Sequence, residues 1–225
     1  MFKVLKFRFK VFLTKLTKGQ YSLEYVNLFK DNDLRSPFTP CINDEFIFHV
    51  LMYLKRKPDI KVFKTNENIQ FGNISFNLSF NELLKSREEP SYFNASNFDK
   101  FVVKIVGYQD DIVNSKMKTI YYFVDDVFIL GENSFNDTSI SESINISKIL
   151  IKKYISESIG KSEEFFIEDK NNNMIYYCDN GFERSIKYFN SENEKSRNIY
   201  KELSRIVLDI NDPTKEIESR LSQIL

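Results

Sequence analysis

The chain has 225 residues, of which 42% are hydrophobic and 28% are charged, a composition typical of a folded globular protein rather than of a disordered tail or a membrane protein. Its 32 lysines and arginines balance its 32 aspartates and glutamates, so the chain as a whole has no net field that would hold a polyanion such as DNA. Its two cysteines, Cys41 and Cys178, are too few for a disulfide framework or for a zinc site made of cysteines.

The composition is skewed toward residues whose codons are rich in A and T. Phe, Tyr, Ile, Asn and Lys dominate, tryptophan is absent and Ala95 is the only alanine. This indicates an AT-rich genome, as found in low-GC bacteria, their phages, organelles and some parasites. Lysines interrupt the apolar residues at the start of the chain, which therefore lacks the continuous apolar centre of a signal peptide. No run approaches the roughly 18 apolar residues of a membrane-spanning helix. We therefore expect an intracellular or virion protein that has no membrane partner.

Residues 1–131 are expected to be mostly β-structure. Apolar side chains alternate with Lys6, Arg8 and Lys10 between residues 5 and 14, with the period of two that is typical of a half-buried strand. Residues 21–29 repeat the alternation after a turn-like Lys-Gly-Gln, which predicts a hairpin. Further strands are predicted from alternation, or from β-branched and aromatic content, at residues 74–81, 101–108 and 119–124.

One helix is expected within this β-rich part, over about residues 44–57. Asp44 and Glu45 come before its apolar stripe, and a basic run followed by Pro58 comes after it. The helix dipole favours acids at the start of a helix and bases at its end, and proline stops a helix. The stripe is broad, so we expect the helix to pack across the N-terminal strands.

The pattern changes to helices and short strands after residue 138. Ser139 and Glu142 form a capping box before apolar residues at helical spacing. Three short strands then follow, and an Asp-Asn-Gly turn before the last of them predicts a meander. A second capping box at Ser191 and Glu194, and an Asp-Pro pair at 212–213, predict two final helices.

Together these elements predict an α+β fold in two parts. Residues 1–131 form a largely antiparallel, β-rich N-terminal part with one packed helix, and residues 138–225 form a helix, a three-stranded meander and two helices. The polar stretch 131–139 is the expected boundary. The sequence leaves open whether each part has its own core or both form one continuous domain.

The sequence contains few recognisable catalytic motifs. The single histidine, His49, cannot form a histidine-rich metal site by itself, and a structural role is favoured for it over that of a general base. No glycine-rich phosphate loop, Gly-x-Ser-x-Gly elbow or His-Glu-x-x-His motif occurs. We therefore predict no bound cofactor, and the sequence leans away from an enzyme.

Three carboxylates form a weak candidate metal site. Asp125 and Asp126 interrupt an apolar run and could bind a divalent cation through oxygen ligands, although a tight hairpin turn is the favoured alternative for this pair. Glu168 precedes Asp169 and Lys170 with the Glu-x-Lys spacing of one large nuclease class, in which a carboxylate and a lysine flank a metal-bound water. A solvated turn is again the favoured alternative. A metal-dependent hydrolase or nuclease that uses these three carboxylates is our third hypothesis.

The basic start of the chain is a candidate nucleic-acid site. Lys6, Arg8 and Lys10 would share one strand face, and the segment 1–18 contains no acid. With phenylalanines close by, the segment is similar to the platforms on which single-stranded nucleic acid stacks. Lysines on an exposed strand also protect a sheet edge from unwanted pairing, and this alternative is favoured. Nucleic-acid binding through these three residues is our second hypothesis.

The leading hypothesis is a non-enzymatic protein-binding or assembly protein, a subunit of a larger complex such as a phage particle or a toxin–immunity pair. It rests on the missing catalytic constellation, the abundant aromatic residues and the neutral charge. A protein partner or a homo-oligomer is expected. Some of the 22 phenylalanines and 12 tyrosines should then form an exposed patch.

Overall fold

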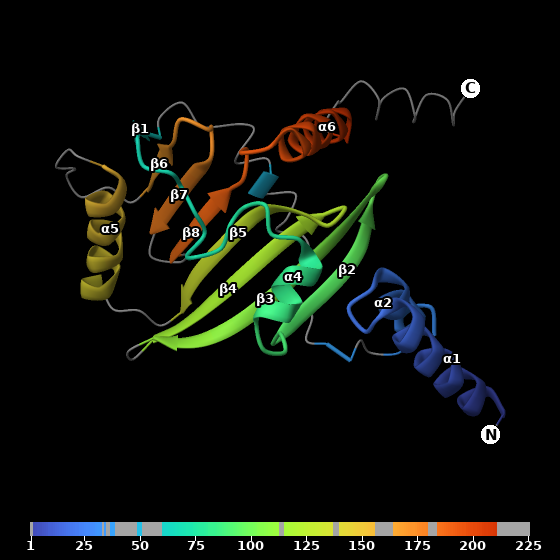
Figure 1. Cartoon of the computed structure of the whole chain (residues 1–225). Helices are drawn as coiled ribbons and strands as arrows, with labels where there is room; N and C mark the ends of the chain where they lie inside the picture. Colours follow the sequence, from blue (N-terminus) through green and yellow to red (C-terminus); the bar gives the residue numbers. More distant parts are fainter. Residues whose placement is uncertain are drawn as a thin grey trace, which may run out of the picture.

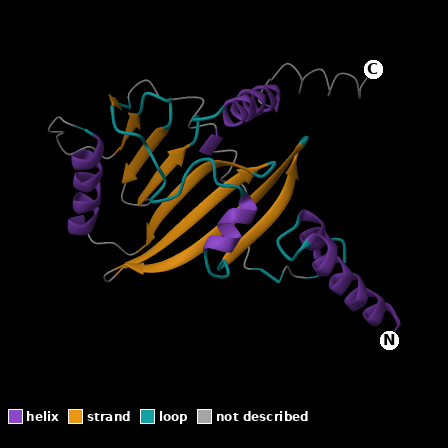
Figure 2. Ribbon diagram, in the orientation of Figure 1, coloured by secondary structure: helices purple, strands orange, loops and turns teal. Residues whose placement is uncertain are grey.

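The computed structural model describes residues 2–32, 34, 37–38, 49–50, 60–112, 115–136, 140–155, 164–179 and 184–210. In this part of the chain eight strands form one mixed sheet, in the order β1-β6-β7-β8-β5-β4-β3-β2, with helices around it (Figures 1 and 2). The strands are β1 (Val62–Lys64), β2 (Tyr92–Phe98), β3 (Phe101–Ile112), β4 (Ser115–Val124), β5 (Val127–Asn136), β6 (Glu164–Glu168), β7 (Met174–Asp179) and β8 (Arg184–Phe189). The helices with described bounds are α1 (Phe2–Lys18), α2 (Leu23–Lys30), α4 (Phe80–Ser86), α5 (Ile140–Tyr154) and α6 (Glu194–Ile210).

The fold is α+β, but the predicted layout of its two parts is wrong. One sheet is continuous across the expected boundary, because β5 pairs antiparallel with β8 from Leu130 opposite Phe189 to Ser134 opposite Ser185. β1 also crosses the boundary and pairs with β6, in the only parallel pairing of this sheet as described. The meander β6-β7-β8 therefore extends the sheet that β2-β3-β4-β5 begins.

The first two predicted strands are helices. Residues 5–14 lie in α1, and most of residues 21–29 lie in α2. Gly19, with φ of +85°, ends α1, and its amide donates to the carbonyl of Lys15 at 3.1 Å; glycine adopts this left-handed conformation without steric cost. Ser22 then begins α2, and its Oγ accepts a hydrogen bond from the amide of Tyr25 at 3.2 Å.

The predicted strand at residues 74–81 is also wrong. Its last residues start α4 with a capping box: the Oγ of Ser79 accepts from the amide of Glu82, and the Glu82 carboxylate accepts from the amide of Ser79 at 2.8 Å. The residues before Ser79 form turns, in which the amide of Ile74 donates to the carbonyl of Phe71 at 3.1 Å. Local capping chemistry therefore outweighs the alternating pattern here.

Most predicted elements beyond residue 100 are confirmed. The strands at 101–108 and 119–124 lie within β3 and β4, and α5, the meander and α6 follow as expected. The cap of α6 differs, because the Oδ1 of Asn193 accepts from the amide of Ser196 at 2.8 Å. Cys178 is buried in β7. Three further predictions fall outside the described residues: Cys41, the helix expected after residue 212, and most of the helix expected at 44–57. Of that last helix, only His49 and Val50 are described, and both are helical.

Helices and loops cover both faces of the sheet. One face packs against α4, α5, α2 and the segment 69–76 and buries a continuous aromatic cluster that includes Phe71, Tyr121 and Phe128. The other face packs against α6 through Ile199, Tyr200 and Leu203. Strands that are covered on both faces are apolar throughout, which agrees with the near-continuous burial of β6, β7 and β8.

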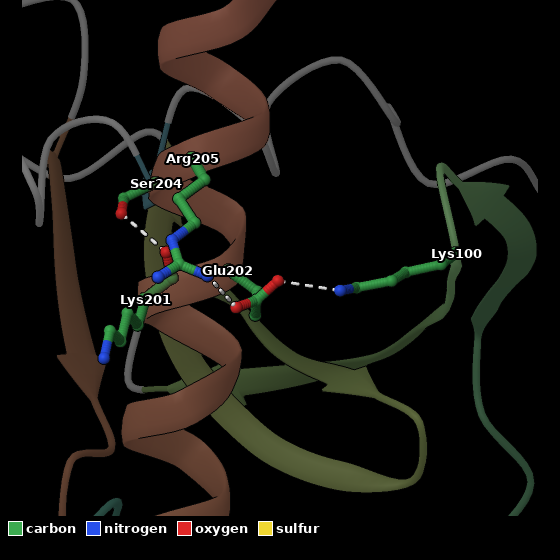
Figure 3. A network of polar contacts seen from close by, with 5 residues as sticks. All are labelled: Lys100, Lys201, Glu202, Ser204 and Arg205. Carbon is green, nitrogen blue, oxygen red and sulfur yellow. Dashed lines mark hydrogen bonds and ion pairs between the residues drawn. The ribbon is translucent and has the colours of Figure 1, made fainter.

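Polar contacts hold α6 on the sheet. The hydroxyl of Tyr200 donates to the carbonyl of Ile129 at 2.6 Å. Lys100, in the turn between β2 and β3, lies 2.7 Å from the carboxylate of Glu202, which also pairs with Arg205 at 2.7 Å (Figure 3). The Lys100 pair is exposed, so it adds at most about 1 kcal/mol, and the apolar contacts of α6 give most of the packing energy.

The two N-terminal helices lie beside the β2 edge of the sheet, and α1 extends outward from it (Figure 1). An aromatic cluster anchors α2: the rings of Tyr21 and Phe38 lie 5.2 and 5.1 Å from the ring of Phe93 on β2. α1 packs in turn on α2, where the ring of Phe7 meets that of Phe29 edge-on at 5.7 Å. α2 therefore fixes α1 to the body of the protein.

Candidate functional site

One side of α1 is an exposed stripe of large apolar side chains. Leu5, Phe9, Phe12, Leu13 and Leu16 are 67, 62, 61, 40 and 71% exposed. At 3.6 residues per turn these five lie within an arc of about 100°. We call this stripe the apolar face of α1.

The apolar face is directed away from the part of the protein that the structure describes. Phe7, Val11 and Thr14 are partly buried, and the helical period places them on the opposite side of α1 from the apolar face. Phe7 makes the ring contact with α2. α1 therefore uses one side to attach to the body and leaves its more apolar side in solvent.

Basic side chains border the apolar face on both sides. Lys6 and Lys10 lie along one border, and Arg8 and Lys15 lie along the other, and all four are exposed. Lys6, Arg8 and Lys10 were expected on one face of a strand. That expectation is wrong because the segment is a helix, in which Arg8 lies on the other side from the two lysines.

Charge is segregated between α1 and the rest of the chain. The segment 1–18 contains six bases and no acid. Removing these six from the 32 bases leaves 26 against 32 acids, so residues 19–225 carry a net charge of −6. The neutral total thus hides a basic helix on an acidic body, and the local field at α1 is positive.

Asp125 and Asp126 form the two-residue turn between β4 and β5. Their φ values are +47° and +64°, which is the geometry of a tight hairpin turn. The Oδ1 of Asp125 accepts from the amide of Val102 at 2.9 Å, and the Oδ1 of Asp126 lies 2.7 Å from the Nζ of Lys104. These contacts place the pair in the turn that was the favoured alternative.

The third predicted metal ligand, Glu168, does not lie near this turn. It ends β6, where its Oε1 is 3.0 Å from the Nζ of Lys64. Two strands, β7 and β8, lie between β6 and β5, which separates β6 from the turn by about 14 Å across the sheet. Within the described residues, no group of three or more histidine, cysteine, aspartate or glutamate side chains could hold a metal ion.

The most unusual polar group is a buried charge network around Glu132. Its Oε1 lies 3.6 Å from the Nζ of Lys187 on β8, and its Oε2 lies 3.3 Å from the Nε2 of His49 and accepts from the hydroxyl of Tyr122 at 3.1 Å. Burial alone would raise the pKa of Glu132, but the His49 ring and the Lys187 charge outweigh burial and lower the pKa to about 2.

The side chains of this network are closed off from solvent. Lys187, Tyr122, His49 and Glu132 are 0, 1, 3 and 4% exposed, so these side chains do not form part of the described surface. The Nζ of Lys187 also donates to the Oγ of Ser185 at 2.8 Å. The favoured structural role of His49 thus has a geometric basis, since its ring supports a buried ion pair.

Two open hollows on the described surface are weaker candidates. One, of about 340 Å³, includes Arg87, whose guanidinium lies over the rings of Tyr108 and Tyr121. The other, of about 510 Å³, is lined in part by Asn77 and Asn193, whose side chains form a hydrogen bond of 3.0 Å. Both hollows are only partly enclosed, whereas small-molecule sites enclose most of their ligand.

Comparison with protein-family models, with curated proteins and with solved structures finds no match for this chain. Its function must therefore be argued from its own residues. None of the helices in the described ranges is long and apolar enough to cross a membrane.

Sequence reasoning located the basic residues of α1 but missed the apolar face between them. The signal was present, because Leu5, Phe9, Phe12 and Leu16 recur at steps of four, three and four residues, which is a helical spacing. Physically, the arrangement offers an apolar contact surface with positive borders. It provides no group placed for proton transfer or nucleophilic attack.

Proposed function

We propose that this chain is a protein-binding component of a larger assembly and that it docks through the apolar face of α1. The observation that supports this is the exposure of Leu5, Phe9, Phe12 and Leu16, each more than 60% exposed on one side of a single helix. Isolated exposed apolar residues are normal, but a contiguous stripe marks an interaction site. Two phenylalanines at its centre match the aromatic enrichment of protein interfaces.

The size of the face suits a docking element. Complete burial of a leucine or phenylalanine side chain contributes about 1.5 to 3 kcal/mol. The main residues of this face are about 60% exposed, so about 60% of that free energy can still be gained when a partner buries them. Five such side chains give roughly 4.5 to 9 kcal/mol before the cost of association is subtracted. That energy is absent in the isolated chain and is released on binding.

Affinity purification from the native source tests this proposal. The tagged wild-type chain is compared with a variant that carries Leu5→Gln, Phe9→Gln, Phe12→Gln and Leu16→Gln, since glutamine is polar but retains helix propensity. We expect a stoichiometric protein partner that resists nuclease treatment, binds the wild-type chain and is absent from the variant.

A matched control separates this face from general surface apolarity. Ile149 on α5 is 65% exposed and Leu34 is 46% exposed, and both lie outside α1, so Ile149→Gln with Leu34→Gln should retain the partner. Circular dichroism should show that both variants remain folded. If the α1 variant binds the same partners as the wild type, the proposal is wrong. If nuclease releases everything that is bound, the nucleic-acid hypothesis replaces it.

A further inference from the structure

The borders of the apolar face indicate what kind of surface receives it. We infer that the partner presents an apolar groove whose two rims carry carboxylates, and that α1 lies in this groove as a helix; this inference rests on the proposed function. The stripe and its charged borders together define both the shape and the charge of the complementary surface.

The anchors set the length and shape of the groove. Leu5, Phe9, Phe12 and Leu16 follow the spacing that helices use when they bind in grooves. From Leu5 to Leu16 the helix rises about 16 Å. The groove must therefore be at least that long, with its deepest part opposite Phe9 and Phe12, because large aromatic anchors at the centre of an interface carry most of its binding energy.

The flanking cations set the charge of the rims. Within the described part of the chain, Lys6 and Lys10 have no ion-pair partner, and the same holds for Arg8 and Lys15 across the apolar face. Lys18, at the C-terminal end of α1, does pair: its Nζ lies 3.8 Å from the carboxylate of Glu24 on α2. A groove with carboxylates on both rims would match the two rows of cations and fix the register of the helix.

Three other occupants fit these observations less well. A second copy of α1 would bring like charges together along both borders. Nucleic acid would match the cations but leave the apolar stripe between them without a dry partner. An anionic bilayer would meet α1 favourably, but it would repel the acidic body, including Glu24 and Asp31 at the two ends of α2. A protein groove can confine its negative charge to the rims.

Site-specific photo-crosslinking in the full-length chain tests the inference. The photoreactive residue p-benzoylphenylalanine replaces Phe12 in the apolar face or, as the control, Ile149 on α5. After irradiation in the native extract, mass spectrometry identifies the captured peptide. We expect position 12 to capture an apolar segment of a partner protein that is flanked by aspartate or glutamate, at a yield well above that from position 149.

A charge series then isolates the rims. Lys6→Gln with Lys10→Gln removes one row of cations, and Arg8→Gln with Lys15→Gln removes the other. With both rows removed, the crosslinking yield from position 12 at low salt should fall roughly tenfold. Raising the salt should lower the wild-type yield toward that of the variant, because salt screens the exposed pairs.

The outcomes separate the two levels of the proposal. Position 12 could capture a protein at a yield that is the same in the charge variants and at high salt. That result would overturn the carboxylate-rimmed groove and leave the proposed function standing. Capture of lipid, supported by sedimentation of the wild-type chain with vesicles of mixed phosphatidylcholine and phosphatidylserine, would overturn both, as would capture of nucleic acid. Capture of a second copy would overturn the groove. A yield at position 12 no higher than at position 149 would overturn both levels.

Discussion

Replacing Glu132 by glutamine should cost about 3 kcal/mol of unfolding free energy at neutral pH. The carboxyl has a pKa of about 2 in the folded chain against an ordinary value of 4.5, and a difference of one pKa unit corresponds to about 1.4 kcal/mol. The substitution also leaves the ammonium of Lys187, which is 0% exposed, without its carboxylate at 3.6 Å. Removing one partner of a buried ion pair costs about 3 to 5 kcal/mol, which is the same order of size.

The effect has a defined pH dependence. Because the folded-state pKa lies below the unfolded-state value, the stabilisation is fully present above pH 4.5 and is lost as the pH falls through about 2. The difference between the wild type and Glu132→Gln should therefore have its full size at pH 7. At about pH 3 it should be less than half as large, because the unfolded chain is then mostly protonated and the folded chain is not.

Urea unfolding followed by circular dichroism at pH 7 and pH 3 measures both quantities. A second variant, Glu132→Met with Lys187→Met, removes both charges and should recover most of the lost stability, since apolar residues often replace a buried pair without loss. A loss below about 1 kcal/mol for Glu132→Gln at pH 7 would refute the reasoning. An equal loss at both pH values, or a double variant less stable than the single one, would refute it as well.

Two further substitutions test the packing of the sheet. Gly131→Ala should destabilise the chain by about 1 to 3 kcal/mol, because a Cβ there would lie 2.4 Å from the Cδ1 of Phe71; an unchanged thermal midpoint would show that the Phe71 ring moves freely. Asp169→Ala should cost about 2 to 4 kcal/mol, because its carboxylate accepts from the backbone amides of Ile69, Asn171 and Asn173 and from the Asn173 side chain. A loss below about 1 kcal/mol in guanidinium unfolding would contradict this account of the loop between β6 and β7.

The N-terminal helices were predicted as strands because the composition blurs the two periods. With so many phenylalanines and lysines, residues 5–13 alternate in polarity, yet Phe12 and Leu16 break the alternation and continue the helical spacing from Leu5 and Phe9. The stronger local evidence was the glycine that ends α1 and the Ser22 cap that begins α2. Capping and turn chemistry depend on a few specific groups, so skewed composition affects them less.

The second half was predicted better because its turns and helix starts are explicit. Turn residues separate the three strands of the meander, and polar caps precede the helices. What no local pattern could supply was the continuity of the sheet: β5 and β8 are adjacent in space, but α5, β6 and β7 all come between them in the chain. Pairings between distant strands depend on how covered faces fit together, and a short sequence window does not contain that information.

The Glu132 network could not be predicted for the same reason. Glu132 and Lys187 face each other because β5 and β8 pair in that register. Lys187 stands between Ile186 and Tyr188. Alternation alone therefore places its side chain on the opposite face of the strand from theirs and predicts that it is exposed to solvent. Both faces of this sheet are covered, however, and the lysine is buried with its partner.

Hydrogen exchange of α1 tests the central claim most directly. The backbone amides of Phe2–Lys18 are measured in the isolated chain and in the complex purified from the native source, with α5 as the internal reference. Docking through the apolar face predicts that amides of α1 exchange at least tenfold more slowly in the complex, while those of Ile140–Tyr154 do not change. Unchanged exchange in α1, together with new protection on another surface, would contradict the account.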